Sequence, residues 1–325
     1  YKIIRGIYFP LLTILLNTHM NYLLLSFGGT GSTILQRLIT MTYHLENIKI
    51  TNTNDIITKS LELDENNNIK RNWKIEYGQT LQEIQTILEK ANKDTALVSR
   101  VSKNHVDARQ DNKQDLLNFY MFTKQFYGKH IFCERENVFE LAMSLAIKGK
   151  SGVYNVFDDN HRKIASEVSE VDERYFIQKI DEYLDYRAWI ADNFARADIV
   201  SYEDLITNTD DVLSNITGYK DTLKKYFGLP MSEILRIHHK DKNISSDQAD
   251  ALALYKELCA TLIKNGTLRE VPIKNSSLQD KKDRIRNFDR CLKIFYQHTR
   301  KFDFIDPSKA TYDFWNQKEV DIQLK

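Results

Sequence analysis

The chain has 325 residues, of which 42% are hydrophobic, and its formal net charge at pH 7 is +1. This composition indicates a globular protein with a sizeable core, and the balanced charge argues against a nucleic-acid partner held by a global basic field. The three cysteines, Cys133, Cys259 and Cys291, form neither a close pair nor a cluster with histidine. A disulfide framework and a zinc site are therefore not expected, and a reducing, cytoplasmic location fits best.

The first nineteen residues differ from the rest of the chain. Lys2 and Arg5 precede a short apolar stretch, residues 7–16, which has about half of the ~20 residues needed to span a bilayer. No small-residue cleavage site follows it, and Met20 stands where a natural start is expected. We expect residues 1–19 to be an extension outside the core, without a membrane span, and residues 20–325 to form a single domain.

Apolar runs and helical periodicities alternate along the chain. In chain order, strands are predicted at 22–27, 95–101, 130–133 and 197–200. Helices are predicted at 32–43, 79–91, 114–126, 137–147, 173–194, 208–217, 219–227, 246–264 and 277–298. Residues 48–75 are largely polar and predict a surface excursion, and residues 149–159 predict a loop. The alternation predicts an α/β fold, with a parallel sheet flanked by helices and a helical C-terminal half.

The strongest motif is the glycine turn Gly28–Thr33, between the first strand and the first helix. Its residues are Gly28, Gly29, Thr30, Gly31, Ser32 and Thr33. A strand that opens through glycines into a helix directs backbone N–H groups and the positive end of the helix dipole at one point, which suits a phosphate. The alternative is a tight turn with a Ser or Thr cap. Neither the lysine of the NTPase loop nor the third glycine of the dinucleotide fingerprint is present.

Three further motifs follow the later strands. Lys103 and His105 come after the second strand, and a neutral histidine there could accept a proton. Arg135 ends the third strand and Ser144 lies two turns into the next helix, so both could reach a second phosphate. Tyr202 begins a Tyr-Glu-Asp-Leu segment after the fourth strand. Alone, each has an ordinary alternative: a solvated loop histidine, a surface ion pair at a helix start, and a buried tyrosine.

In this order the four motifs resemble those of the PAPS-dependent sulfotransferase family, over about residues 21–230. The resemblance implies a P-loop-type α/β fold and a reaction without a metal ion. It implies that the glycine turn binds the 5′-phosphosulfate and that His105 is the catalytic base, and we assign Lys103 to the charge on the departing phosphate. It further implies that Arg135 and Ser144 hold the 3′-phosphate and that Tyr202 lies near the nucleotide.

Two positions depart from the family pattern. Gly29 stands where the family has Lys or Arg, and the spacing from Arg135 to Ser144 is one residue longer than in many members. The expected function is transfer of a sulfuryl group from PAPS to a hydroxyl or amine of a small-molecule, carbohydrate or peptide acceptor. Two alternatives stay open: a nucleotide-dependent kinase with a degenerate phosphate loop, and a catalytically inactive binding protein with this fold. The acceptor would be set by residues 52–75, 149–170 and the C-terminal helices.

Overall fold

The computed structural model describes residues 21–54, 59–63, 69–75, 81–91, 95–103, 106, 123–124, 126–154, 156, 158–238, 244–268 and 277–322. These residues form two compact units. Unit 1 contains the described parts of 21–25, 48–131 and 196–198, and unit 2 contains those of 26–47, 132–195 and 199–322. Each unit is built from separate stretches of sequence, so the chain passes between them several times.

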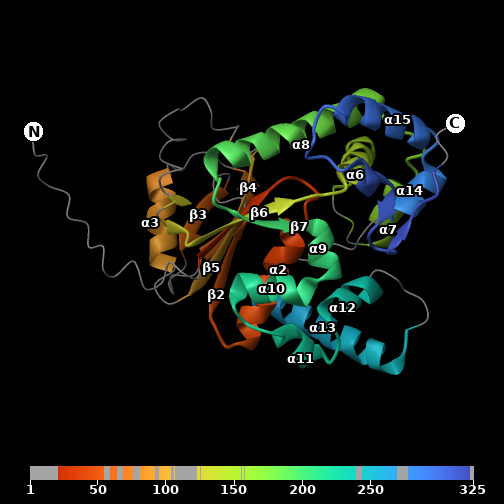
Figure 1. Ribbon diagram of the computed structural model, residues 1–325. Coiled ribbons are helices and arrows are strands. Elements are labelled where there is room, and N and C mark those ends of the chain that lie inside the picture. Colours follow the sequence, from red (N-terminus) through yellow and green to blue (C-terminus); the bar gives the residue numbers. More distant parts are fainter. Residues whose placement is uncertain are drawn as a thin grey trace, which may run out of the picture. The chain divides into compact units, whose positions relative to one another are not determined.

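The fold is of the mixed α/β type and contains a five-stranded parallel sheet, as the sequence predicts. The strand order is β2-β5-β1-β6-β7 (Figure 1). The bounds are β1 Asn21–Ser26, β2 Ile50–Asn54, β5 Ala96–Ser102, β6 Lys129–Glu134 and β7 Asp198–Ser201. All six residues of β1 are buried, which accounts for its continuous apolar run. Because the chain adds strands first on one side of β1 and then on the other, the turn after β1 lies at a topological switch point.

Unit 1 also holds a hairpin that the sequence does not predict. Strands β3 (Lys59–Leu63) and β4 (Ile69–Ile75) pair antiparallel, and α3 (Leu81–Ala91) packs beside β3 (Figure 1). Together with β2, which pairs in parallel with β5, they place three strands in the stretch 48–75, where the sequence predicts only a polar surface excursion. The polar side chains in this stretch hide the strand pattern, since only one face of such a hairpin needs apolar residues.

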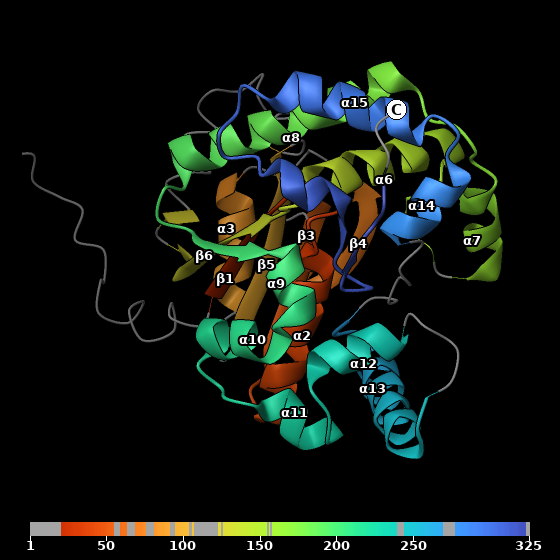
Figure 2. The same cartoon turned by 45° about the vertical axis from the view of Figure 1, so that its right-hand side comes forward.

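Unit 2 is mostly helical, and its helices gather in two groups. In the first group, α6 packs along α8, with α7, α14, α15 and the short helix η2 around them (Figure 2). In the second, α2 lies beside α10 and α11, and α9, α12 and α13 complete the group. The first group comprises α6 Val138–Ser151, α7 Asp159–Ser166, α8 Glu173–Asn193, α14 Leu278–Arg284, α15 Phe288–Thr299 and η2 Pro307–Thr311. The second comprises α2 Ser32–Leu45, α9 Tyr202–Thr207, α10 Thr209–Thr217, α11 Thr222–Phe227, α12 Met231–His238 and α13 Ser246–Lys264. A two-stranded ribbon, β8 (Tyr312–Asp313) and β9 (Lys318–Glu319), follows η2.

Aromatic rings join the helices of the first group. The buried ring of Phe139 on α6 lies edge-on to Phe176 of α8 and to Phe288 and Phe295 of α15, with centroids 5.1–5.7 Å apart. Edge-to-face pairs of this kind add about 0.5–1.5 kcal/mol each beyond the apolar area they bury. This contact fixes the helix that carries Ser144.

One predicted helix is divided in the structure. The stretch 277–298 forms α14 and α15, because Ile285 is extended and the residues after it bond to another segment. Arg286 N donates to Ser169 O at 2.8 Å, and the Asn287 side chain pairs with both backbone groups of Val171. The predicted loop at 149–159 begins later, since α6 continues to Ser151. The helix predicted at 114–126 lies outside the described residues, apart from Thr123, Lys124 and Phe126.

A membrane-crossing helix was not expected. In the part of the chain that the structure describes, no helix has both the length and the apolar character that a crossing requires.

Candidate functional site

The glycine turn after β1 is partly open to solvent. Gly28 and Gly29 are exposed, and Gly29 and Gly31 adopt left-handed φ values of 89° and 80°. Thr30 is buried, and its Oγ1 donates to Phe27 O at 2.8 Å and accepts from Phe27 N at 3.3 Å. The Thr30 hydroxyl therefore helps to shape the turn.

Helix α2 begins at this turn without a side-chain cap. Its N-cap is Gly31, and no side chain accepts a hydrogen bond at the cap. The first helical hydrogen bond runs from Leu35 N to Gly31 O at 3.0 Å. Ser32 is buried and Thr33 is exposed. An uncapped start of a 14-residue helix at an exposed glycine turn presents backbone N–H groups and a partial positive charge, which together suit an oxyanion.

Neighbouring side chains explain why glycine occupies two positions of the turn. A Cβ atom at Gly29 would lie 2.8 Å from Leu141 Cδ1, and one at Gly31 would lie 2.7 Å from Tyr202 Cδ2. Both residues also have φ values that side chains rarely adopt. A lysine or arginine at position 29, as in the family that the motifs resemble, does not fit this backbone.

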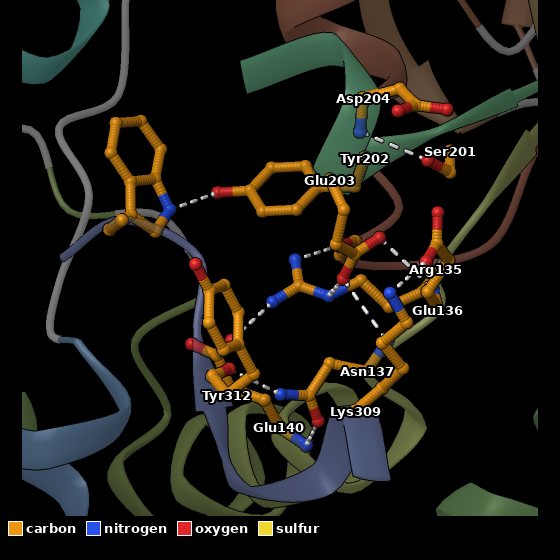
Figure 3. A network of polar contacts seen from close by, with 12 residues as sticks. Arg135, Glu136, Asn137, Glu140, Ser201, Tyr202, Glu203, Asp204, Lys309 and Tyr312 are labelled. Carbon is orange, nitrogen blue, oxygen red and sulfur yellow. Dashed lines mark hydrogen bonds and ion pairs between the residues drawn. The ribbon is translucent and has the colours of Figure 1, made fainter. Parts of the chain in front are cut away.

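Arg135 lies beside the turn and is almost completely buried, with 6% of its surface exposed. Its Nη2 donates to Glu140 Oε2 at 2.7 Å, and its Nε lies 3.0 Å from Glu203 Oε1 (Figure 3). Its Nη1 donates to Gly29 O at 3.4 Å, and its guanidinium carbon lies 3.9 Å from the centre of the Tyr202 ring. Nη1 and Nη2 thus donate hydrogen bonds within the protein, whereas Nε makes an ion pair with Glu203 but no hydrogen bond. Arg135 ties the turn to α6 and α9.

The backbone around Arg135 is held from two sides. Tyr183 of α8 accepts from Arg135 N at 2.8 Å and donates to Arg135 O at 2.9 Å. Glu203 accepts from the N–H groups of Glu136 and Asn137 at 2.9 and 3.1 Å. Asn137 in turn caps α6 by accepting from Glu140 N at 2.9 Å (Figure 3). The segment after β6 therefore has a fixed course before any ligand binds.

Two residues from the C-terminal part of the chain complete the cluster. Lys281 of α14 donates to Glu140 Oε1 at 2.7 Å, and Trp315 donates from Nε1 to the Tyr202 hydroxyl at 2.7 Å. We call the cluster the Arg135 network; its members are Arg135, Glu140, Tyr202, Glu203, Lys281 and Trp315. All are buried, and the two cations balance the two carboxylates.

Burial and pairing act in opposite directions on the charges of this network. Burial alone would lower the pKa of Arg135, but attraction to Glu140 and Glu203 outweighs it and raises the pKa above its ordinary value. Burial raises the pKa of the Tyr202 hydroxyl, which stays neutral. Burial also raises the pKa of Glu203, although Arg135 and two backbone N–H groups oppose the shift.

Lys148 stands outside the balanced network. It lies on α6, one turn after the half-buried Ser144, and is itself half-buried. Burial, and then repulsion from Lys281 and Arg135, lower the pKa of Lys148 to about 8. Within the described residues, no carboxylate pairs with this amine.

The predicted site residues fall into two sets. The structure brings the glycine turn, Arg135, Ser144 and Tyr202 into unit 2. Lys103 is half-buried immediately after β5 in unit 1, and His105 lies outside the described residues. The roles of Lys103 and His105 therefore stay predictions from the sequence.

Sequence reasoning missed several residues of the site. They are Glu140, Lys148, Glu203, Lys281 and Trp315. Lys148 had a signal, because it continues the stripe of Leu141 and Leu145 at helical spacing inside an otherwise apolar stretch. The partners of Arg135 had none, since they come from segments far away in the chain. Among the described residues, no group of three or more His, Cys, Asp or Glu side chains could hold a metal ion.

Comparison with known proteins assigns no family. The chain matches no protein-family model and no curated protein sequence.

The contact between Gly31 and Tyr202 predicts an unequal cost of alanine at two left-handed glycines. Gly31→Ala should lower the free energy of unfolding by about 2–4 kcal/mol, because it combines strain in φ with a steric clash. Gly218→Ala is the matched control, since Gly218 has φ 78° but nothing within 4 Å of an added methyl group, and should cost about 1 kcal/mol. Urea unfolding of both variants measures the difference, and equal costs would contradict the contact.

The Arg135 network predicts a large loss of stability when its central cation is removed. Arg135→Leu should lower the free energy of unfolding by about 3–5 kcal/mol, because Glu140 and Glu203 are then buried with an unmatched charge. Arg290→Leu is the control: it removes an exposed ion pair with Glu173, 2.8 Å long, and should cost no more than about 1 kcal/mol. Similar losses in the two variants would show that Arg135 is not the centre of a buried ionic cluster.

Proposed function

We propose that the chain is a PAPS-dependent sulfotransferase whose 5′-phosphosulfate subsite is the glycine turn Gly28–Thr33. One observation carries the proposal: the turn is exposed at Gly28 and Gly29 and opens into α2 without a side-chain cap. It agrees with the ordered motifs in the sequence, and the turn follows the central strand of a parallel sheet, where such folds bind ligands.

The residues of the turn suit an anionic donor by shape as well as by charge. Glycine at positions 28 and 29 leaves the backbone accessible, so a phosphate can approach the N–H groups closely. The hydrogen bond from Arg135 to Gly29 O holds the turn in this form, which reduces the ordering cost of binding. Arg135 therefore acts first as a positioning residue, and its predicted contact with the 3′-phosphate, like that of Ser144, stays a prediction.

The proposed reaction is an in-line transfer. PAPS supplies the sulfuryl group, and an acceptor oxygen or nitrogen forms a bond to sulfur while the bond from sulfur to the 5′-phosphate oxygen breaks. His105 removes the acceptor proton, and Lys103 offsets the negative charge that grows on the departing phosphate. Backbone N–H groups of the turn hold the same phosphate throughout, by the positioning logic of phosphoryl transfer.

A second candidate is a binding protein without catalysis. It is favoured by Gly29, because Leu141 and the left-handed φ exclude the basic side chain that would otherwise stabilise the transferred group. This candidate shares the nucleotide site and differs only in turnover.

The first test is calorimetric titration with 3′-phosphoadenosine 5′-phosphate (PAP), AMP and ATP with magnesium. We expect PAP to bind most tightly, and binding of magnesium-ATP alone would favour a kinase instead. Gly28→Asp should weaken the binding of PAP at least about tenfold, since it adds a negative charge to the turn. Gly28→Ala is its control, because a methyl group there meets Leu145 Cδ2 only at an ordinary 3.5 Å. PAP affinity that is the same in both variants would exclude the turn as the site.

The second test separates the enzyme from the binding protein. With labelled PAPS and a panel of sugars, phenols and peptides, we expect transfer to one acceptor class. His105→Ala should then lower turnover by about 10²–10⁴-fold and leave PAP affinity unchanged. Unchanged turnover in this variant would remove His105 as the base. PAP binding without transfer to any acceptor would support the second candidate.

A further inference from the structure

One stripe of helix α6 faces the glycine turn. Leu141 Cδ1 would lie 2.8 Å from a Cβ at Gly29, and Leu145 Cδ2 would lie 3.5 Å from a Cβ at Gly28. Lys148 is the next member of this stripe, since positions i, i+4 and i+7 share a helix face. Ser144 lies one helical turn before Lys148, on the side toward which helical side chains lean.

The amine of Lys148 is repelled by two other cations. These are Lys281 of α14 and Arg135, and both lower the pKa of the amine. Glu140 and Glu203 neutralise these two cations, which leaves the charge of Lys148 without a counterion among the described residues. A partly buried ammonium group without a counterion is costly, and an anion from outside the chain would relieve that cost.

We propose that Lys148, with Ser144 on the preceding helical turn, forms a subsite for a dianionic phosphate or sulfate group of the ligand. The inference deepens the proposed function and rests on it for the identity of the nucleotide: the group is the phosphate that the glycine turn does not hold. The sequence motifs predict that Arg135 makes the main charged contact with this phosphate, and we assign that contact to Lys148 instead. Ser144 has a hydroxyl that can donate to the same group, and its burial is only partial.

Binding at this subsite is coupled to protonation. The free amine loses its proton at a lower pH than an ordinary lysine, and a bound dianion reverses that shift. Titratable groups on α6 and on the elements packed against it include Glu140 on α6 itself, Tyr175 on α8, His161 on α7 and Lys309 on η2, and Tyr202 and Glu203 belong to the adjoining Arg135 network. Above pH 8, the complex therefore takes up a proton, and affinity for the anion falls as the pH rises further.

The test compares Lys148→Met with Lys256→Met, which removes an exposed lysine from α13. PAP carries two phosphates and AMP only one, so calorimetry with both nucleotides isolates the second group. We expect Lys148→Met to weaken the binding of PAP at least about tenfold and that of AMP less than about twofold. Lys256→Met should change neither affinity. Because the substitution removes an uncompensated charge, its Tm at pH 7 should be no lower than that of the wild type. PAP affinity in Lys148→Met equal to that of the wild type would overturn the subsite.

Proton uptake gives a readout that a merely structural role would not move. At pH 8.5 the phosphates of PAP are fully ionised. Calorimetry in buffers of different ionisation enthalpy should show uptake of more than about 0.3 proton per PAP bound by the wild type, and none by Lys148→Met. Equal uptake by both proteins would contradict the assignment of the proton to Lys148.

A third arm separates failure of the subsite from failure of the proposed function. If neither nucleotide binds, but sodium sulfate raises the Tm of the wild type and not of Lys148→Met, the anion subsite stands and the sulfotransferase proposal falls. If sulfate raises both Tm values equally, the subsite is overturned. If PAP binds and only the Lys148 dependence is missing, the proposed function stands without the subsite.

Discussion

The buried guanidinium of Arg135 is the interaction on which the candidate site of unit 2 depends. A cation with 6% of its surface exposed needs carboxylates, and Glu140 and Glu203 supply them from two helices. The remaining donor of the group reaches Gly29 O, so the same residue that joins α6 to α9 also fixes the glycine turn. The buried charges of this cluster hold one another in place, because removal of any one of them costs stability. Through Arg135 they also hold the turn, which therefore does not need a ligand to keep its shape.

Within this site, the residues that stabilise the fold differ from those that could bind an anion. Two cations and two carboxylates cancel in the Arg135 network, which therefore attracts an anion little as a whole. The positive character that a nucleotide could use comes from the uncapped start of α2 and from the amine of Lys148. Leu141 and Leu145 of α6 lie beside Gly29 and Gly28 of the turn, and Lys148 is the next residue of the same helical stripe. A ligand with two separated anionic groups would match this arrangement.

Local pattern predicts much of the fold but little of the network. The apolar run of β1, the glycines after it and the periodicity of α2 are read directly from sequence, because strand, turn and helix each depend on near neighbours. The division of the helix at 277–298 depends instead on hydrogen bonds from Arg286 and Asn287 to a distant segment. Likewise, the sequence indicates Arg135 by its place at the end of a strand, but it does not indicate its partners, since folding alone brings them together.

Hydrogen–deuterium exchange with PAP tests the central claim most directly, namely that the turn after β1 and the adjoining face of α6 bind one anionic nucleotide. The account predicts slower exchange of the backbone amides at 28–35 and at 141–150 when PAP is added. AMP should slow exchange at 28–35 alone, because it lacks the second phosphate. Binding of PAP that leaves exchange at 28–35 unchanged would contradict the account.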